Sequence, residues 1–236
     1  MSDQILGIWL PLVAAALVQA SFSLGVSMLT LLSGHLLSQE KSAQRRSRLS
    51  LMYIGGALTV TGAGLIALIY LLQAPGWANS SRFWTVLTGA SVGVGLAVML
   101  FYYRWDKQGT RLWLPRRAAE YLYARTKATR RAFEAYVLGG AAVVAELIFV
   151  AAPLAIAAGL IAPLPRLEQI AAVVTYVIIV LLPLLALFAA NVGGHKISRL
   201  QRWRERNKRF LQVAAGVLLI ILGGYLLTYK VLGAAA

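Results

Sequence analysis

The sequence has no cysteine and is poor in acidic residues. Among its 236 residues are 23 lysines and arginines but only eight aspartates and glutamates, so the formal net charge is +15. A chain without thiols cannot form disulfides, carry out thiol redox chemistry or hold a metal through cysteine. Charged residues of both signs make up 13% of the sequence, whereas soluble domains carry about 25%. This composition excludes an ordinary water-soluble domain.

Hydrophobic residues, in contrast, make up 59% of the sequence and gather in long runs. Apolar runs of about 18 residues or more predict membrane-spanning helices. Six runs qualify, at 5–37, 51–72, 83–103, 133–162, 169–191 and 210–232. The predicted fold class is therefore an all-α membrane protein with six transmembrane helices. The first run is too long for one straight span across about 30 Å of hydrocarbon, and we expect it to tilt, break or extend beyond the bilayer.

The positive charges predict the orientation of these spans. Loops 38–50, 104–131 and 195–209 hold four, nine and seven of the 23 lysines and arginines, which leaves Arg82, Arg166 and Lys230 for the other side. Because cytoplasmic loops are rich in lysine and arginine, we place these loops in the cytoplasm and both termini outside it (N-out, C-out). The chain is then a multi-pass protein of the inner (plasma) membrane. The anionic lipid of the inner leaflet, and not nucleic acid, is the expected partner of the basic loops.

The chain is predicted to be a single polytopic membrane domain over 1–236. Residues 1–110 hold spans 1–3, and residues 111–236 hold a linker helix and spans 4–6. Spans 1–3 start outside and spans 4–6 start in the cytoplasm, so two halves with one fold would form a 3+3 inverted repeat, as in many transporters. For the linker at 115–131 we expect an amphipathic helix on the inner leaflet, with Leu122 and the tyrosines towards lipid. The alternative is a plain cytoplasmic extension of span 4.

One acidic residue falls near the middle of an apolar run. Glu146 lies in the run 133–162, at about the mid-depth of the bilayer, where insertion of a charged acid costs roughly 2.5–3.5 kcal/mol. Its carboxyl group either coordinates a cation or exchanges protons, or else it is protonated and only packs against another helix. Pro153 follows seven residues later and is expected to kink or break the helix. Such breaks are tolerated in a membrane where they line a cavity.

Polar residues of span 1 predict the opposite wall of such a cavity. Gln19, Ser23, Ser27 and Thr30 follow a spacing of i, i+4, i+8 and i+11, so they share one face of a helix. Together with Glu146 and Pro153 they form the predicted substrate- or ion-binding site. The alternative is close helix packing, which small hydroxyl residues also serve.

The remaining polar features predict no enzyme. His35 and His195 fall at the cytoplasmic ends of spans 1 and 5. They either form a two-histidine metal or proton site or are two incidental residues at the membrane interface. The glycine-rich stretch 55–64 of span 2 predicts helix packing. Because the sequence offers no nucleophile–base pair, no paired carboxylates and no phosphate-binding loop, we expect no catalytic residues, no cofactor and no metal site.

Two passages carry a resemblance to a known superfamily. The stretch AELIFVAAPLAIAA (145–158), in which an acid precedes a proline, and the ending RFLQVAAGVLLIILGGYLLTY (209–229) resemble the fourth and last spans of the lysine-exporter (LysE-like) superfamily. That group includes amino-acid, metal and glycolipid-type exporters and the DsbD/CcdA-type electron carriers. The chain departs from the electron carriers because it has no cysteine. It departs from the amino-acid exporters, whose first span carries a proline-rich motif, because its own first span holds only Pro11.

The resemblance implies a six-helix, Cys-less exporter and leaves the substrate open. The predicted function is therefore export of a small or amphipathic solute across the membrane, coupled to protons or to a cation through Glu146. The alternative is a non-transporting scaffold or partner subunit of a larger membrane complex, and a homo-oligomer is compatible with either function.

Overall fold

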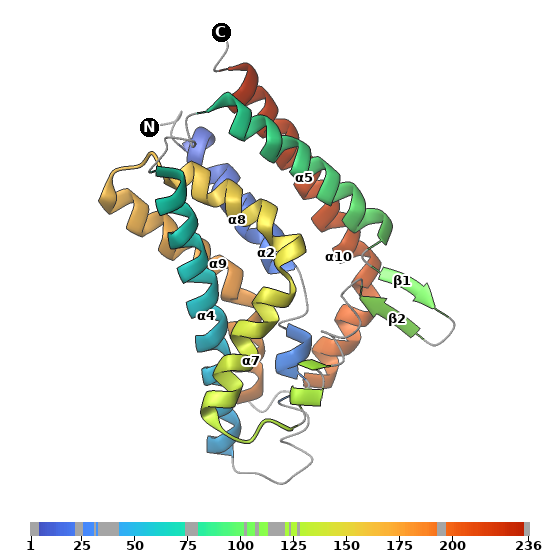
Figure 1. The fold of residues 1–236 in the computed structure, drawn as a ribbon. Coiled ribbons are helices and arrows are strands. Elements are labelled where there is room, and N and C mark those ends of the chain that lie inside the picture. Colours follow the sequence, from blue (N-terminus) through green and yellow to red (C-terminus); the bar gives the residue numbers. More distant parts are fainter. Residues whose placement is uncertain are drawn as a thin grey trace.

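The fold is a bundle of helices with one short hairpin (Figure 1). The computed structural model describes residues 5–21, 26–30, 32, 43–73, 80–101, 103–106, 109–112, 121–122, 124–126, 128–192 and 197–233. Its elements in chain order are η1 (Ile5–Trp9), α2 (Leu10–Ser21), α4 (Ala43–Gln73), α5 (Ser81–Phe101), β1 (Tyr103–Asp106), β2 (Gly109–Leu112), α7 (Ala132–Ala145), α8 (Leu147–Ile161), α9 (Arg166–Val192), α10 (Ile197–Leu226) and η3 (Leu227–Leu232).

The described helices indicate a membrane protein. Four are long and apolar enough to cross a bilayer, namely Ser47–Gln73, Ser81–Leu100, Arg166–Ala190 and Arg209–Leu232. The pair α7 and α8 would add a fifth span, although the two helices are bent by 82°. Of the first predicted run, the described part gives a shorter apolar helix, Gly7–Ser21. The described residues thus hold four or five of the six predicted spans.

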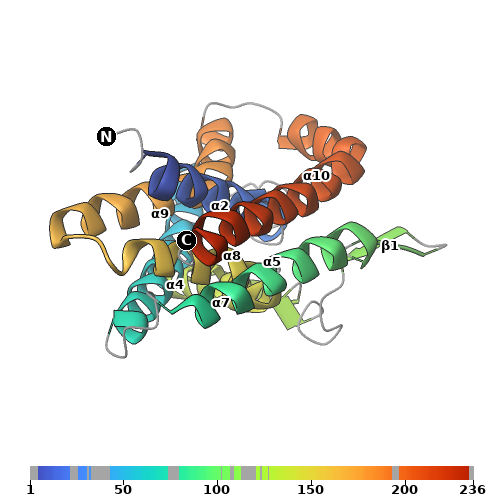
Figure 2. The ribbon, with the colours of Figure 1, turned by 90° about the horizontal axis from the view of Figure 1, so that it is seen from above.

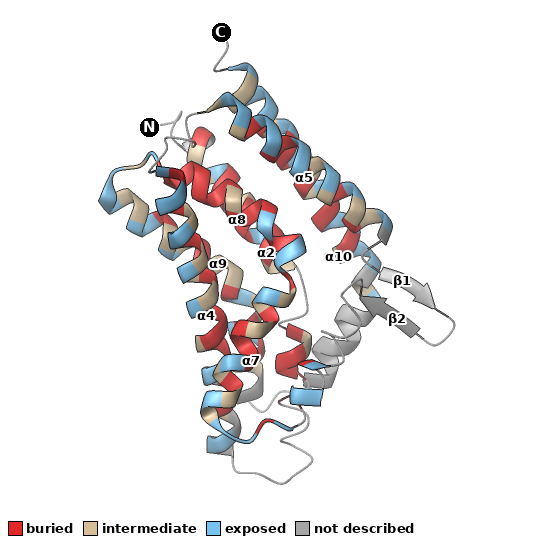
Figure 3. Cartoon of the chain, viewed as in Figure 1, coloured by how far each residue is buried: buried red, intermediate tan, exposed pale blue. Residues whose placement is uncertain are grey.

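The outward faces of these helices are exposed (Figure 3). Large hydrophobic side chains are exposed along them, such as Leu71 on α4, Val86 on α5 and Ile221 on α10. Large exposed apolar patches are rare on soluble monomers. Lipid tails are as apolar as these side chains, so in a bilayer the exposure carries no penalty.

Two helix pairs are held by glycines at their crossing points. A Cβ atom on Gly56 of α4 would collide with the carbonyl group of Tyr136 in α7, and one on Gly139 of α7 would collide with that of Tyr53 in α4. The two backbones therefore touch, which is how small residues bring membrane helices together. This contact confirms the packing role predicted for the glycine-rich stretch of span 2 at Gly56.

The helices α5 and α10 lie side by side in both views (Figures 1 and 2). A Cβ atom on Gly95 would lie 2.8 Å from the carbonyl oxygen of Gly216, and a Cβ atom on Gly216 would lie 2.8 Å from the carbonyl oxygen of Gly95. The side-chain amide of Gln212 in α10 donates to the carbonyl oxygens of Val98 (2.6 Å) and Met99 (2.9 Å) in α5. Close backbone contact and a buried polar cross-link together fix this pair.

The short helix α8 lies in the centre of the bundle. Most of its 15 residues are buried, and Figure 3 shows it mainly in the colour of buried residues. It packs against α2, α4 and α5, and Gly159 leaves room for the rings of Phe83 and Trp84. A helix that is apolar on every side must be surrounded by other helices or by lipid; here protein covers most of it, and Leu147 and Ile148 of its first turn are exposed.

The linker between the two halves differs from the prediction. Strands β1 and β2 pair as an antiparallel hairpin that the sequence analysis did not predict. Leu122 is 3% exposed and packs with Met28 and Leu29, so the expectation that it faces lipid is wrong. The Thr126 hydroxyl contacts the Met28 sulfur at 3.3 Å. The apolar residues near Met28 provide a protein surface for this segment, which therefore turns its apolar side inward. Residues 115–120 lie outside the described part.

We predict that Gly139→Ala lowers the stability of the purified protein in detergent by about 1–3 kcal/mol, because the new methyl group forces two backbones apart. Thermal or denaturant unfolding measures the change. Gly62→Ala is the matched control, since a Cβ atom there meets nothing within 4 Å; it should stabilise the helix by roughly 0.4–1 kcal/mol. Equal melting of the two variants would contradict the close crossing.

Candidate functional site

The broken helix at Glu146 is the central feature of the site. α7 ends at Ala145, α8 begins at Leu147, and Glu146 between them has φ −85° and ψ 0°. These angles lie in the sparsely populated bridge region, where many active-site residues are found. The Glu146 N–H reaches the carbonyl oxygens of Ala142 and Val143, both at 3.2 Å, and its own carbonyl oxygen accepts from Phe149 (2.8 Å) and Val150 (3.1 Å). One residue thus ends one helix and begins the next.

The break does not lie where the sequence analysis placed it. Pro153 was expected to kink or break the helix, but it lies inside α8, which continues to Ile161. The prediction that the helix bends at Pro153 was therefore wrong. The chain turns by 82° at the acidic residue instead, so that α8 can enter the centre of the bundle while α7 stays beside α4.

A small cavity lies against this break. It has a volume of about 40 Å³, and a single water needs about 10–15 Å³, so it has room for a few waters or one small ion. Its polar lining comes from Gln19 of α2, Tyr53 and Thr61 of α4, and Glu146. The other lining residues are apolar or glycine: Ala20, Val26, Ala57, Gly139, Val143, Val150, Val180, Leu181, Pro183 and Leu184.

The polar groups of this cavity are buried. Glu146 is 8% exposed, and Tyr53 is fully buried. The fully buried Tyr176 of α9 donates its hydroxyl hydrogen to Gln19 Oε1 at 2.5 Å. The Thr61 hydroxyl is buried and has no hydrogen-bond partner among the described residues. A buried polar group without a partner costs about 1–3 kcal/mol, which water or a ligand in the cavity would offset.

Of the six predicted site residues, the structure brings two to this cavity. Gln19 and Glu146 both line it. Thr30 is buried, but its hydroxyl donates to the carbonyl oxygen of Val26 at 2.6 Å within its own helical segment. Thr30, Ser27 and Pro153 do not line the cavity. Ser23 lies outside the described residues, as do His35 and His195.

The sequence analysis missed the contribution of α4. Tyr53, Ala57 and Thr61 all line the cavity, and they recur every four residues along one face of the helix. The same spacing argument that was applied to span 1 would have found them. The glycines of the same stretch predict packing. Both inferences hold, since Tyr53 and Ala57 contact Gly139 of α7 through their backbones and also line the cavity.

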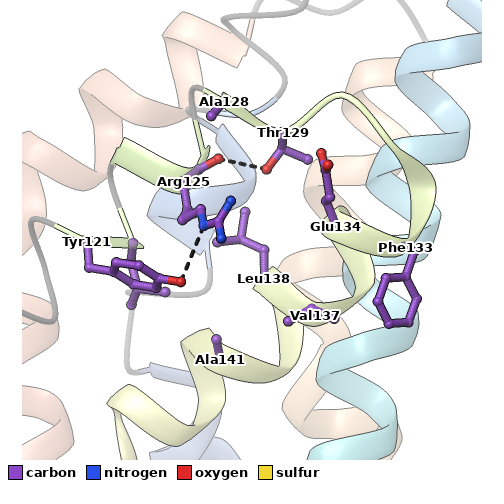
Figure 4. A pocket seen from close by; sticks show the side chains of 10 residues that line it. Tyr121, Arg125, Ala128, Thr129, Phe133, Glu134, Val137, Leu138 and Ala141 are labelled. Carbon is purple, nitrogen blue, oxygen red and sulfur yellow. Dashed lines mark hydrogen bonds between the residues drawn. The ribbon is translucent and has the colours of Figure 1, made fainter.

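A second, wider pocket lies at the start of α7 (Figure 4). Its volume is about 230 Å³, and it combines an apolar wall that includes Phe133 and Val137 with the polar side chains of Tyr121, Arg125 and Glu134. Arg125 Nε donates to the Tyr121 hydroxyl at 3.2 Å. A carboxylate oxygen of Glu134 accepts the backbone N–H groups of Arg130 (2.8 Å) and Arg131 (3.1 Å). The Glu134 carboxylate therefore stabilises the N-terminus of α7.

Comparison with protein-family models, with curated proteins and with solved structures finds no match. Within the described part of the chain, no group of three or more histidines and acids could hold a metal ion.

We predict that Tyr176→Phe destabilises the protein by about 1–3 kcal/mol, because the buried Gln19 oxygen loses the hydroxyl that donates to it. Melting in detergent measures this. Tyr70→Phe on α4 is the control, since Tyr70 is 70% exposed and its ring faces the surroundings. A Tyr176→Phe variant that melts with the wild type would show that the bond contributes nothing.

Proposed function

We propose that the protein is an integral membrane transporter, an exporter of a small or amphipathic solute, in which Glu146 binds a cation or exchanges a proton. The observation that carries the proposal is the position of this acid. It stands at the break between α7 and α8, on a cavity that also receives Gln19, Tyr53 and Thr61. Acids at membrane depth that face a polar cavity mark ion pathways and proton relays more often than they mark packing sites.

The ends of the two half-helices support this role. The C-terminus of α7 carries partial negative charge and the N-terminus of α8 partial positive charge, and both lie at Glu146. In many secondary transporters, broken helices offer such ends to substrates and coupling ions near the midplane of the bilayer. A cation bound there would meet the Glu146 carboxylate and the carbonyl groups that end α7.

The size of the cavity limits what this conformation holds. About 40 Å³ accommodates water or a small ion but not an organic solute, since ligand pockets are usually about 300–1,000 Å³. Under the proposal the structure corresponds to a closed state. Opening requires the walls of the cavity to separate, and the bend at Glu146 is the natural hinge because it joins two half-helices that meet at an angle of 82°.

The six-span topology, with both termini outside and an inverted repeat, is part of the proposal. The directions in which the helices run support this topology. The starts of α4 and α7 line one pocket, as expected for two spans that both leave the cytoplasm, and α5 and α10 run in opposite directions (Figure 1). The resemblance of 145–158 and 209–229 to LysE-like exporters supports the same plan.

We predict that Glu146→Gln abolishes transport while stability is kept, because the amide has the shape of the acid but neither titrates nor carries charge. Purified protein is reconstituted in liposomes that contain a pH-sensitive dye, and candidate amino acids and amphipathic amines are added. The wild type should couple solute addition to proton movement, and Glu146→Gln should fall to the rate of empty liposomes.

The control for this assay is Glu168→Gln, which removes an acid from the first turn of α9 and should transport at the wild-type rate. Transport by Glu146→Gln at that rate, at every pH tested, would refute the role of the acid. If the wild type moves none of the solutes, and Glu146→Gln melts at or above the wild-type temperature, the scaffold alternative is favoured.

A further inference from the structure

One hydroxyl group on the cavity beside Glu146 is left unpaired by the fold. Thr61 of α4 is 2% exposed and lines this cavity, and its hydroxyl has no hydrogen-bond partner among the described residues. Other hydroxyls in these helices, such as those of Thr59 and Ser91, donate to the carbonyl oxygen four residues earlier. Because the Thr61 hydroxyl does not make this bond, both lone pairs of its oxygen remain available to a ligand in the cavity.

Two more oxygen-bearing side chains line the same cavity from other parts of the fold. Gln19 of α2 contributes its amide, whose oxygen accepts the hydroxyl hydrogen of Tyr176 and keeps a second lone pair. Glu146 contributes its carboxyl group at the break between α7 and α8. A carboxylate together with neutral oxygens is the kind of ligand set that hard cations prefer.

The charge and the size of the cavity limit which cation it can take. Glu146 is the only acid among the described lining residues, and no lysine, arginine or histidine is among them. Residues 22–25, which connect the lining residues Ala20 and Val26, carry no charged side chain. One carboxylate balances one positive charge, whereas a divalent ion would leave excess charge buried, which is costly away from water. The volume of about 40 Å³ favours a small monovalent ion.

We propose that this cavity binds one sodium ion, held by the Glu146 carboxylate, the Thr61 hydroxyl and the Gln19 amide oxygen. The inference rests on the role proposed for Glu146 and names the ion, since the same carboxylate takes either a proton or a sodium ion. Thr61 separates the two cases. A proton needs only the carboxyl group, whereas a hard metal cation needs several oxygen ligands. The other titratable side chains at this place are the phenols of Tyr53 and Tyr176.

The test uses the full chain in a neutral detergent at one alkaline pH and measures the melting temperature as sodium chloride replaces choline chloride at constant ionic strength. Sodium should raise the melting temperature saturably, because it binds the folded state, and potassium chloride should raise it less, because the potassium ion is larger. In Thr61→Val, which keeps the shape and loses the hydroxyl, the apparent dissociation constant for sodium should rise at least about tenfold. Glu146→Gln should show no shift with sodium.

The matched control is Thr88→Val on α5. Thr88 is also buried, and its hydroxyl has no hydrogen-bond partner among the described residues, but it does not line the cavity. This variant should bind sodium like the wild type. If Thr61→Val melts early without sodium, Thr61→Ser and Thr61→Ala replace it. Both lack the methyl group, and only Thr61→Ala, which also lacks the hydroxyl, should bind sodium more weakly.

Several outcomes would overturn the sodium site. A potassium shift equal to the sodium shift would show that the cavity does not select sodium. An unchanged sodium affinity when the Thr61 hydroxyl is removed would exclude Thr61 as a ligand. No sodium shift in the wild type, with proton-coupled transport that Glu146→Gln abolishes, would refute the sodium site and leave the proposed function in place. A sodium shift that Glu146→Gln removes, with transport that survives this substitution, would support the ion site and refute the proposed role in transport.

Discussion

The contact between the backbones of α4 and α7 is the constraint on which the rest of the structure depends. Gly56 and Gly139 allow the two helices to touch, and this contact sets the register between them. With that register fixed, Tyr53 and Thr61 of α4 face the cavity at the end of α7. The same contact brings the arginines that precede α7 beside those at the start of α4. One crossing therefore positions the acidic site and also gathers these arginines.

The break at Glu146 follows from a different demand. The chain must carry the apolar α8 into the centre of the bundle while α7 stays against α4, and a straight helix cannot do both. In hydrocarbon the backbone groups at a bend need partners within the protein. Here the Glu146 N–H and carbonyl groups keep hydrogen bonds to both half-helices, so the turn leaves the carboxyl group as the polar element that faces the cavity. Function at this position would use a feature that the fold already requires.

Composition and hydropathy were sufficient to predict a helical membrane protein and to single out Glu146. Both depend on properties of single segments, which a sequence displays directly. The position of the break could not be predicted, because proline is a local signal whereas the bend is decided by what surrounds α8. Tyr53 and Thr61 were missed for a related reason, since which face of α4 meets the cavity depends on its contact with α7. Leu122 looked lipid-facing from its own segment and is buried by residues near Met28, almost a hundred positions away.

The central claim is that Glu146 titrates in contact with the cavity, and carbodiimide labelling tests it most directly. Hydrophobic carbodiimides react with a protonated carboxyl group in an apolar site, and mass spectrometry of peptides identifies the modified residue. The account predicts that Glu146 in reconstituted protein is labelled at low pH and that labelling falls as the pH is raised, because the acid gives up its proton to water in the cavity. Labelling that does not change with pH, or that is absent throughout, would contradict it.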